Sequence, residues 1–141
     1  KQAEIDSYKR KISGPLMDRI DMQINLSRVE VSELKTKEKG ESSAAIRERV
    51  VKARLLQQER LEALGMHCNA QMGRSEVVKY CQLDAAAQNV MERYFNMLNL
   101  SARSHDRILK VARTIADLAG SENIEAVHLA EAIQLRTSVR P

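Results

Sequence analysis

Three arginines stand where a guanidinium could act outside its own chain. Arg19 lies in the stretch "GPLMDRID" (14–21), just after a Gly-Pro turn. Arg103 and Arg107 are four residues apart in "SARSHDR", so on a helix they would lie on nearly the same side. Arginine is always charged and presents a planar fork of donors, which suits the spread negative charge of a phosphoryl group in transfer. These residues are the candidates for phosphate chemistry.

Each candidate also has a simpler interpretation. Arg19 could pair with Asp18 or Asp21 at a helix end, and on the residues alone this option is favoured, since exposed ion pairs are common and weak. Arg103 in the first turn of a helix would oppose the macrodipole at a cost of about a few tenths of a kcal/mol, which is a weak sign of a functional role.

On the first long helix, basic residues interleave with acidic ones as on a solvated face: Arg47, Arg49, Lys52, Arg54 and Arg60 beside Glu48, Glu59 and Glu62.

The sequence lacks the motifs of a self-sufficient active site. A GxxxxGK[ST] loop, an HExxH pair, a GxSxG elbow and a Cys/His cluster are all missing. His67, His105 and His128 are dispersed, and each is expected to be a surface or capping residue rather than a metal ligand or a base. We therefore predict no metal site and no catalysis by this chain alone.

Composition favours a compact bundle of helices. Of the 141 residues, 43% are hydrophobic but only 3% aromatic, so the core must be built from helix-compatible Leu, Ile, Val, Met and Ala. No apolar run approaches the roughly 20 residues of a membrane span. Cys68 and Cys81 are far apart, as expected of reduced thiols in a cytosolic protein. The net charge of +4 permits polyanions without demanding them.

The N-terminal part carries mixed signals. Residues 1–12 predict a short helix that ends at the turn 13–15. Apolar and polar residues then alternate in "MQINLSRVEV" (22–31), which predicts a strand whose sheet lies upstream, in a part of a longer protein. The charged stretch that follows lacks apolar periodicity and predicts a linker.

From residue 43 onward the pattern is helical. Serine caps and a stop at Gly65 frame a first long helix over 43–64. A short helix is expected over 74–80 and a second long one over 83–99. The clearest helix runs from the cap at Ser101 to the stop at Gly120, and the last covers 122–136. These elements predict an antiparallel helical cluster.

Four ordered motifs, "GPLMDRID", "GESSAAIRERV", "LSARSHDRILKVARTIADLAGS" and "HLAEAIQLR", resemble the C-terminal part of the magnesium-chelatase-like AAA+ ATPases of the ComM type. The resemblance covers nearly the whole chain; Met17 stands where a leucine is usual, and "SHD" varies. It implies an all-α fold: a helical AAA+ lid bundle over 43–141, preceded by a linker over 33–42 and by the C-terminal helix and strand of the AAA+ core over 1–32.

The resemblance also implies roles for the three arginines. Arg19 is similar to the arginine finger that reaches the γ-phosphate bound by a neighbouring subunit of a ring. Arg103 is similar to the sensor 2 arginine of the lid, with Arg107 as the alternative one turn on. The full-length protein is then expected to use ATP and Mg²⁺, neither of them bound by this portion alone. It is expected to be a cytoplasmic hexamer without a membrane segment, and a DNA motor in branch migration during natural transformation.

Two other functions stay open on the residues themselves. Lys110, Arg113 and Arg107 could make the third long helix a basic nucleic-acid-binding module without an ATPase role, although Asp106 and Asp117 would neutralise the stripe. The chain could also be a scaffold of packed helices. Removing Arg19 or Arg103 would then leave the ATPase rate unchanged.

Overall fold

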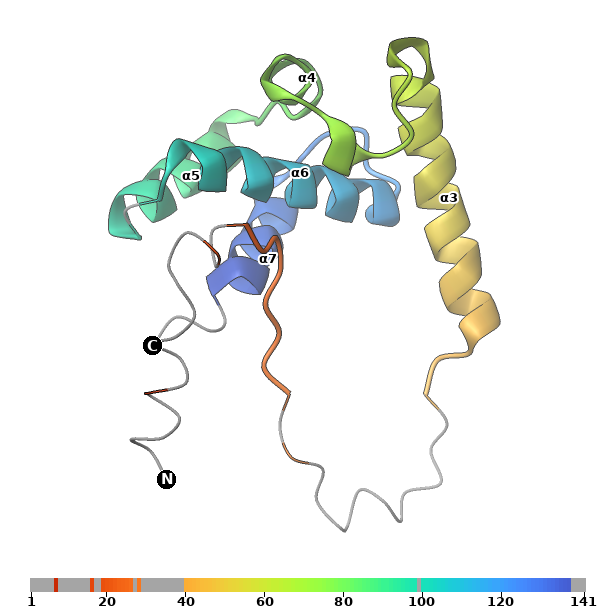
Figure 1. Cartoon of the computed structure of the whole chain (residues 1–141), viewed down its shortest axis with the longest axis horizontal. Coiled ribbons are helices and arrows are strands. Elements are labelled where there is room, and N and C mark those ends of the chain that lie inside the picture. The colour runs from red at the N-terminus through yellow and green to blue at the C-terminus, as the bar shows by residue number, and fades with distance from the viewer. Residues whose placement is uncertain are drawn as a thin grey trace.

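The computed structural model describes residues 7, 16, 19–26, 28, 40–98 and 100–137, with the side chain of residue 137 excepted. The described chain is all-α, as predicted, and its helices α3 to α7 are joined by short loops and two 3₁₀ turns (Figure 1). The helix expected over 1–12, apart from residue 7, the turn at 13–15 and most of the linker over 33–42 lie outside the described residues. None of the described helices is long and apolar enough to cross a membrane.

Helix α3 (Ser43–Leu61) has the predicted ends. The Ser42 Oγ accepts a hydrogen bond from the Ala45 N–H at 3.2 Å, which satisfies one of the free donors of the first turn. A 3₁₀ turn, η2 (Glu62–Leu64), extends the helix to Gly65, whose φ of 68° lies in the left-handed region that glycine adopts without strain. The predicted helix over 43–64 with its stop at Gly65 is confirmed.

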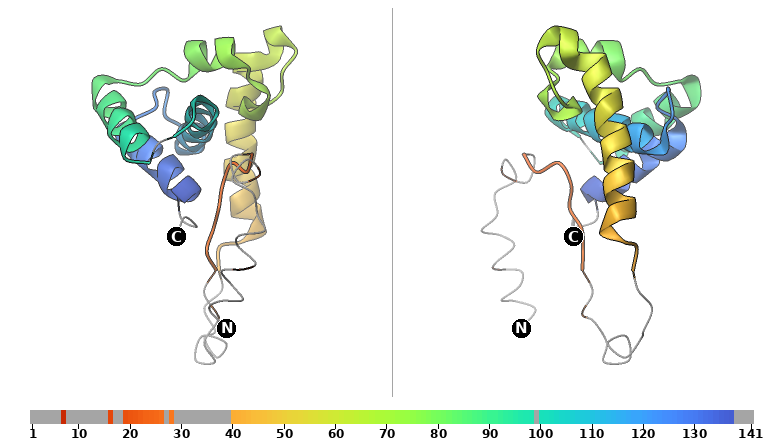
Figure 2. Two further views of the ribbon diagram at one scale, coloured as in Figure 1. Left: turned by 60° about the vertical axis from the view of Figure 1, so that its left-hand side comes forward. Right: turned by 90° about the vertical axis from the view of Figure 1, so that its right-hand side faces the viewer.

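Only a narrow stripe of α3 is buried. Its members, Ala53, Gln57 and Leu61, follow each other at intervals of four residues. Ile46 and Val50, nearer the start of the helix, are exposed. Helix α3 therefore stands beside the bundle and meets it only with its C-terminal half (Figure 2).

Residues 69–97 form a 3₁₀ turn and two helices of the bundle. A 3₁₀ turn, η3 (Asn69–Gln71), leads into α4 (Arg74–Tyr80), and the bounds of α4 are those predicted. Helix α5 (Ala85–Met97) starts at Asp84, whose carboxylate accepts a hydrogen bond from the Ala87 N–H at 2.7 Å. A parallel β-bridge joins Leu83 to Ile124 ahead of the last helix.

Helix α6 (Ala102–Ala119) is the centre of the fold. It starts at the predicted cap Ser101 and ends at Gly120, which has a φ of 69°. Helix α7 (Ala126–Thr137) follows after a short loop. α6 packs against α3, α4 and α7, and α5 packs against α7 (Figure 1). Residues on α6 consequently lie within reach of most other elements.

The core is aliphatic, as the composition predicts. Its members are small or branched side chains and two methionines: Leu61, Met72, Val77, Cys81, Ala87, Met91, Leu100, Ile108, Leu109, Ala112, Ala116, Ile124, Leu129, Ala132 and Ile133. Both cysteines are free thiols; Cys81 is buried and Cys68 half-buried. Burial raises the pKa of the Cys81 thiol to about 11.

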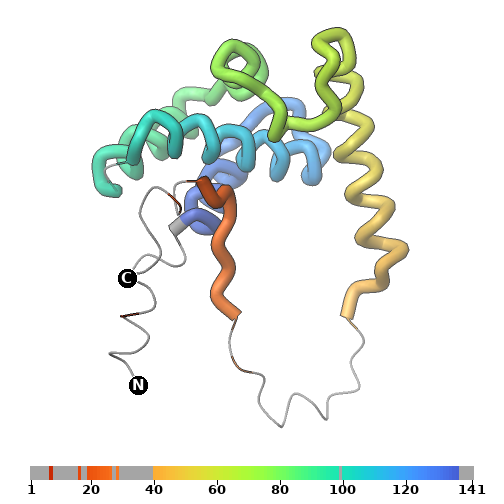
Figure 3. The backbone as a smooth tube through the Cα atoms, viewed as in Figure 1, coloured from red at the N-terminus to blue at the C-terminus, as the bar shows by residue number. Residues whose placement is uncertain are grey.

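The strand predicted over 22–31 is not found in its described part. Residues 22–26 form no β-ladder, because the described chain offers no second strand to pair with them. The Gln23 N–H instead donates to the carbonyl oxygen of Leu135 in α7 at 2.6 Å. Figure 3 shows this segment meeting α7 and then running away from the bundle.

Candidate functional site

A groove of about 710 Å³ runs along α6. Its walls come from the η3–α4 segment, from α7 and from residues 21 and 22 of the N-terminal segment. Its floor is largely apolar, with side chains that include Met72, Val111 and Ile115. The groove thus joins three parts of the chain that are far apart in sequence.

Charged side chains rim the groove. Four are cationic (Arg74, Arg103, Arg107 and Lys110) and three are acidic (Asp21, Asp106 and Glu131). The groove therefore carries an excess of one positive charge. Arg103, Arg107, Lys110 and Thr114 follow one another at helical intervals of three or four residues, so a single side of α6 supplies most of this rim.

The four cations differ in what they contact. Arg74 forms an ion pair with Asp106, and the Lys110 Nζ donates to the Ala70 carbonyl oxygen at 3.3 Å. Arg103 is exposed, and its guanidinium makes no hydrogen bond or ion pair with any residue that the structure describes. Among the described cations of the groove, Arg103 is thus the one whose N–H donors are all available to an anionic ligand.

Arg107, on the rim of the groove, contacts the N-terminal segment. Its Nη1 donates to the Arg19 carbonyl oxygen at 2.9 Å, and the same guanidinium forms an ion pair with Asp21. The side chain is 28% exposed. Arg107 thereby joins α6 to residues more than 80 positions earlier in the chain.

Arg19 lies in an exposed turn next to this contact. Its backbone N–H donates to the Leu16 carbonyl oxygen at 2.9 Å, which closes the turn. Its guanidinium forms no ion pair with any described residue, because Asp21 is paired with Arg107; Asp18 lies outside the described residues. The structure therefore places all three candidate arginines at one end of α6, with Arg19 and Arg103 facing solvent.

Sequence reasoning missed Arg136. This arginine is buried near the end of α7, where its Nη1 donates to the Ile20 carbonyl oxygen at 2.7 Å and its Nη2 to the Ser104 Oγ at 3.1 Å. In the sequence it is a basic residue in the last turn of a helix, where the macrodipole alone favours a cation. No pattern in the chain marks the contacts that it makes.

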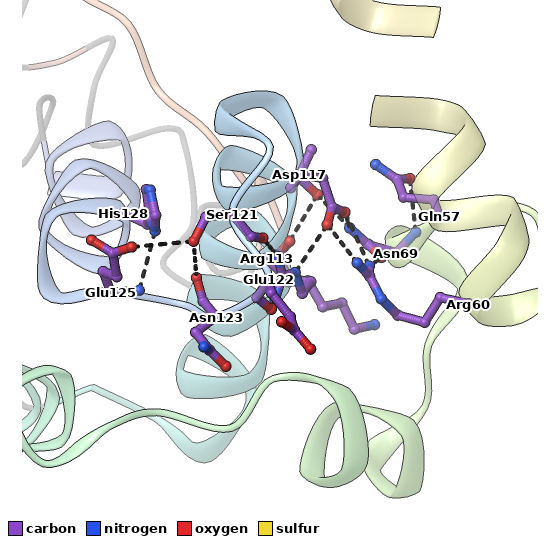
Figure 4. A network of polar contacts seen from close by, with 12 residues as sticks. Gln57, Arg60, Asn69, Arg113, Asp117, Ser121, Glu122, Asn123, Glu125 and His128 are labelled. Atoms are coloured by element: carbon purple, nitrogen blue, oxygen red, sulfur yellow. Dashed lines mark hydrogen bonds and ion pairs between the residues drawn. The ribbon is translucent and has the colours of Figure 1, made fainter. Parts of the chain in front are cut away.

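A second polar cluster fastens α3 to α6 (Figure 4). Its centre is the buried Asp117 carboxylate, which accepts hydrogen bonds from Arg60 at 2.6 and 3.0 Å, from Asn69 at 2.8 Å and from Arg113 at 3.1 Å. Arg113 also donates to the carbonyl oxygens of Ser121 and Glu122. Burial lowers the pKa of Arg113, while the charge of Asp117 opposes that change.

This cluster corrects two predictions. The sequence predicts Arg60 on a solvated face of the first helix, but its side chain is only 19% exposed because it reaches Asp117. The sequence offers Arg113 to a basic stripe, but this residue is buried within the cluster. The i, i+4 spacing of Arg113 and Asp117 was a usable signal for their ion pair. Nothing local to α3 marked the partner of Arg60.

The histidines do not form a metal site. His128 is buried, and its Nδ1 accepts a hydrogen bond from the Glu125 N–H at 3.1 Å, which is a capping contact at the start of α7. His105 lies against Asp106, and His67 is exposed. Among the described residues no three His, Cys, Asp or Glu side chains are grouped so that they could hold a metal ion.

Comparison with known families gives two matches. Residues 40–136 match the family "Magnesium chelatase, subunit ChlI C-terminal", and residues 1–34 match the family "Magnesium chelatase, subunit ChlI". The first match alone covers more than half of the chain.

Several curated proteins are similar to nearly all of this chain. It is 40% identical over 138 residues to the competence protein ComM of Haemophilus influenzae, which is 97% of this chain and 26% of that protein. It is 38% and 37% identical over 130 residues to the uncharacterized proteins YifB of Escherichia coli and Salmonella typhimurium, in both cases 92% of this chain and 25% of the relative. The chain thus spans about a quarter of the length of these relatives.

Proposed function

The chain belongs to the magnesium chelatase ChlI C-terminal family, and on that premise we propose that it completes a nucleotide site on a neighbouring subunit of an AAA+ ring ATPase. One observation carries the proposal. The guanidinium groups of Arg19 and Arg103 are both exposed and unpaired within the described chain, and Arg107 connects the segments that bear them.

The two arginines have separate roles. Arg19 is the arginine finger, whose donors stabilise the charge that develops on the γ-phosphoryl oxygens as the bond to the leaving oxygen breaks. Arg103 is the sensor 2 residue, which binds the phosphates from the lid side. ATP, Mg²⁺ and the phosphate-binding loop belong to the remainder of the full-length protein. The described chain offers cations to this site, and no three of its described His, Cys, Asp or Glu side chains are grouped so that they could hold a metal ion.

The assembly and its substrate are also part of the proposal. A finger that acts on a neighbour requires a homo-oligomeric ring, here a cytoplasmic hexamer. The name "competence protein" of the Haemophilus influenzae relative agrees with a role in natural transformation. The proposed role there is that of a DNA motor in branch migration. The basic character of the chain is compatible with a polyanionic substrate.

The test mixes two defective subunits of the full-length protein. One lacks the phosphate-binding lysine of the core and the other carries Arg19→Ala. Each alone should lose ATPase activity by about a hundred-fold or more, with nucleotide binding intact in Arg19→Ala. The mixture should recover activity, because intact composite sites form between unlike subunits. Absence of recovery at every mixing ratio would overturn the trans assignment.

The alternative, a basic nucleic-acid-binding module, has less support. Of its three expected contacts, Arg113 is buried, Arg107 is paired with Asp21, and Lys110 donates to the backbone of Ala70. Such a module needs a row of cations open to phosphates.

A further inference from the structure

We propose that Arg107 and Arg136 are positioning residues that hold Arg19 and Arg103 at a fixed spacing, so that both engage the neighbouring nucleotide as one unit. This inference rests on the proposed function and adds two residues to it. It also decides which of Arg103 and Arg107 contacts the nucleotide.

Arg136 bridges the immediate neighbours of the two outward arginines. One arm of its guanidinium donates to the carbonyl oxygen of Ile20, the residue after Arg19, at 2.7 Å. The other arm donates at 3.1 Å to the Oγ of Ser104, the residue after Arg103. A planar fork with fixed geometry sets the distance between its two acceptors, so this buried side chain works as a spacer.

Ser104 is itself held in place. Its N–H donates to the Ser101 Oγ at 3.2 Å, which is the cap of α6, and the two hydroxyl groups lie 3.0 Å apart. Arg136 therefore contacts the rigid start of α6 rather than a loose side chain. If the first turn of α6 moves, Arg136 should move the N-terminal segment that carries Arg19 with it.

Arg107 makes a second connection from one turn further along α6. It holds the Arg19 carbonyl oxygen and the Asp21 carboxylate, on either side of Ile20. Both acceptors contact the Nη1 of Arg107 and hold this side chain against the N-terminal segment, whereas no donor of Arg103 contacts a described residue. We therefore assign the contact to the nucleotide to Arg103.

The N-terminal segment depends on these polar contacts for its position. Its apolar side chains do not anchor it, since Met22, Ile24 and Leu26 are all exposed. The Gln23 N–H bond to Leu135 adds a third attachment to the lid. Because this segment buries little apolar area, its hydrogen bonds and one ion pair determine the position of Arg19.

The first test is a charge swap in the full-length protein. Asp21→Arg and Arg107→Asp should each lower kcat for ATP hydrolysis about ten- to a hundred-fold with little change in KM, because a misplaced catalytic group costs rate more than binding. The double variant restores the ion pair, and its kcat should be at least tenfold higher than that of either single variant. A double variant as slow as Arg107→Asp would contradict a positioning role of the ion pair between Arg107 and Asp21, and the inference would fail.

The second test asks whether Arg136 acts through Arg19. Arg136→Met should lower kcat in the parent and have little further effect when Arg19→Ala is already present, and Arg136→Lys should give an intermediate rate. Equal effects of Arg136→Met in both backgrounds would indicate a merely structural role. Arg49→Met is the control, since the Arg49 guanidinium also donates two hydrogen bonds, in this case to the Glu41 carboxylate, but on exposed α3. If Arg136→Met does not fold, the charge swap decides alone.

The two proposals can fail separately. If Arg19→Ala keeps the parental ATPase rate, the proposed function is contradicted. If Arg19→Ala is impaired but the charge swap does not recover and Arg136→Met acts independently of Arg19, only the positioning role is contradicted.

Discussion

The buried Asp117 carboxylate accepts two hydrogen bonds from the Arg60 guanidinium, at 2.6 and 3.0 Å, across 57 positions of sequence. This pair ties α3 to α6 at the point where only a narrow stripe of α3 is buried. A buried carboxylate with two arginines and an asparagine around it has its charge compensated and its lone pairs used.

Asp117→Ala should lower the free energy of unfolding by about 3–5 kcal/mol, because it leaves the buried Arg113 without its counter-charge. Urea unfolding of the chain measures this. The matched control is Glu48→Ala, which breaks an exposed i, i+4 pair with Lys52 and should leave stability unchanged. Equal losses in both variants would contradict the buried role of Asp117.

Stability should fall at alkaline pH partly through Cys81. Its thiol has a folded pKa of about 11, above the ordinary value of 9.0, so the unfolded chain loses this proton first as pH rises. Below pH 9 the group has no effect on stability; between 9.0 and 11 it should destabilise the fold by up to about 2 kcal/mol. Urea unfolding of the parent and of Cys81→Ala across this range measures the difference. Parallel pH profiles would show that Cys81 is not the group responsible.

Gly120→Ala should cost about 1–2 kcal/mol, because a side chain at a φ of 69° meets its own backbone. Gly120→Asn should cost less, since asparagine tolerates this region. Gly40→Ala is the control: no atom lies within 4 Å of an added Cβ there and its φ is not positive, so its thermal midpoint should not move. A neutral Gly120→Ala would mean that the end of α6 can adopt another conformation.

The chain by itself should bind duplex DNA weakly, with a shallow dependence of the binding constant on salt. The reason is that its expected basic stripe is interrupted: Arg113 is buried and Arg107 is paired. A fluorescence titration at several salt concentrations measures the slope. Tight binding with a steep slope would favour the nucleic-acid module over the lid.

Helix ends were predictable because their signals are local. Ser42, Ser101, Gly65 and Gly120 stand at helix ends and act within one turn of their own position. The bounds of α4 were likewise predictable from the local sequence alone. The strand over 22–31 stays a prediction: alternation shows only that a segment could pair, and the described chain supplies no second strand for it.

The sequence by itself determined the helices, the aliphatic core and the presence of three arginines suited to phosphate. Only the tertiary structure decided which of the chain's arginines are committed to distant internal contacts: Arg60 to Asp117, Arg107 to Asp21, Arg136 to Ile20 and Ser104. The physical reason is distance along the chain. A cap acts on the next few residues, whereas a guanidinium finds its acceptor across tens of positions, where no pattern in the sequence records the encounter.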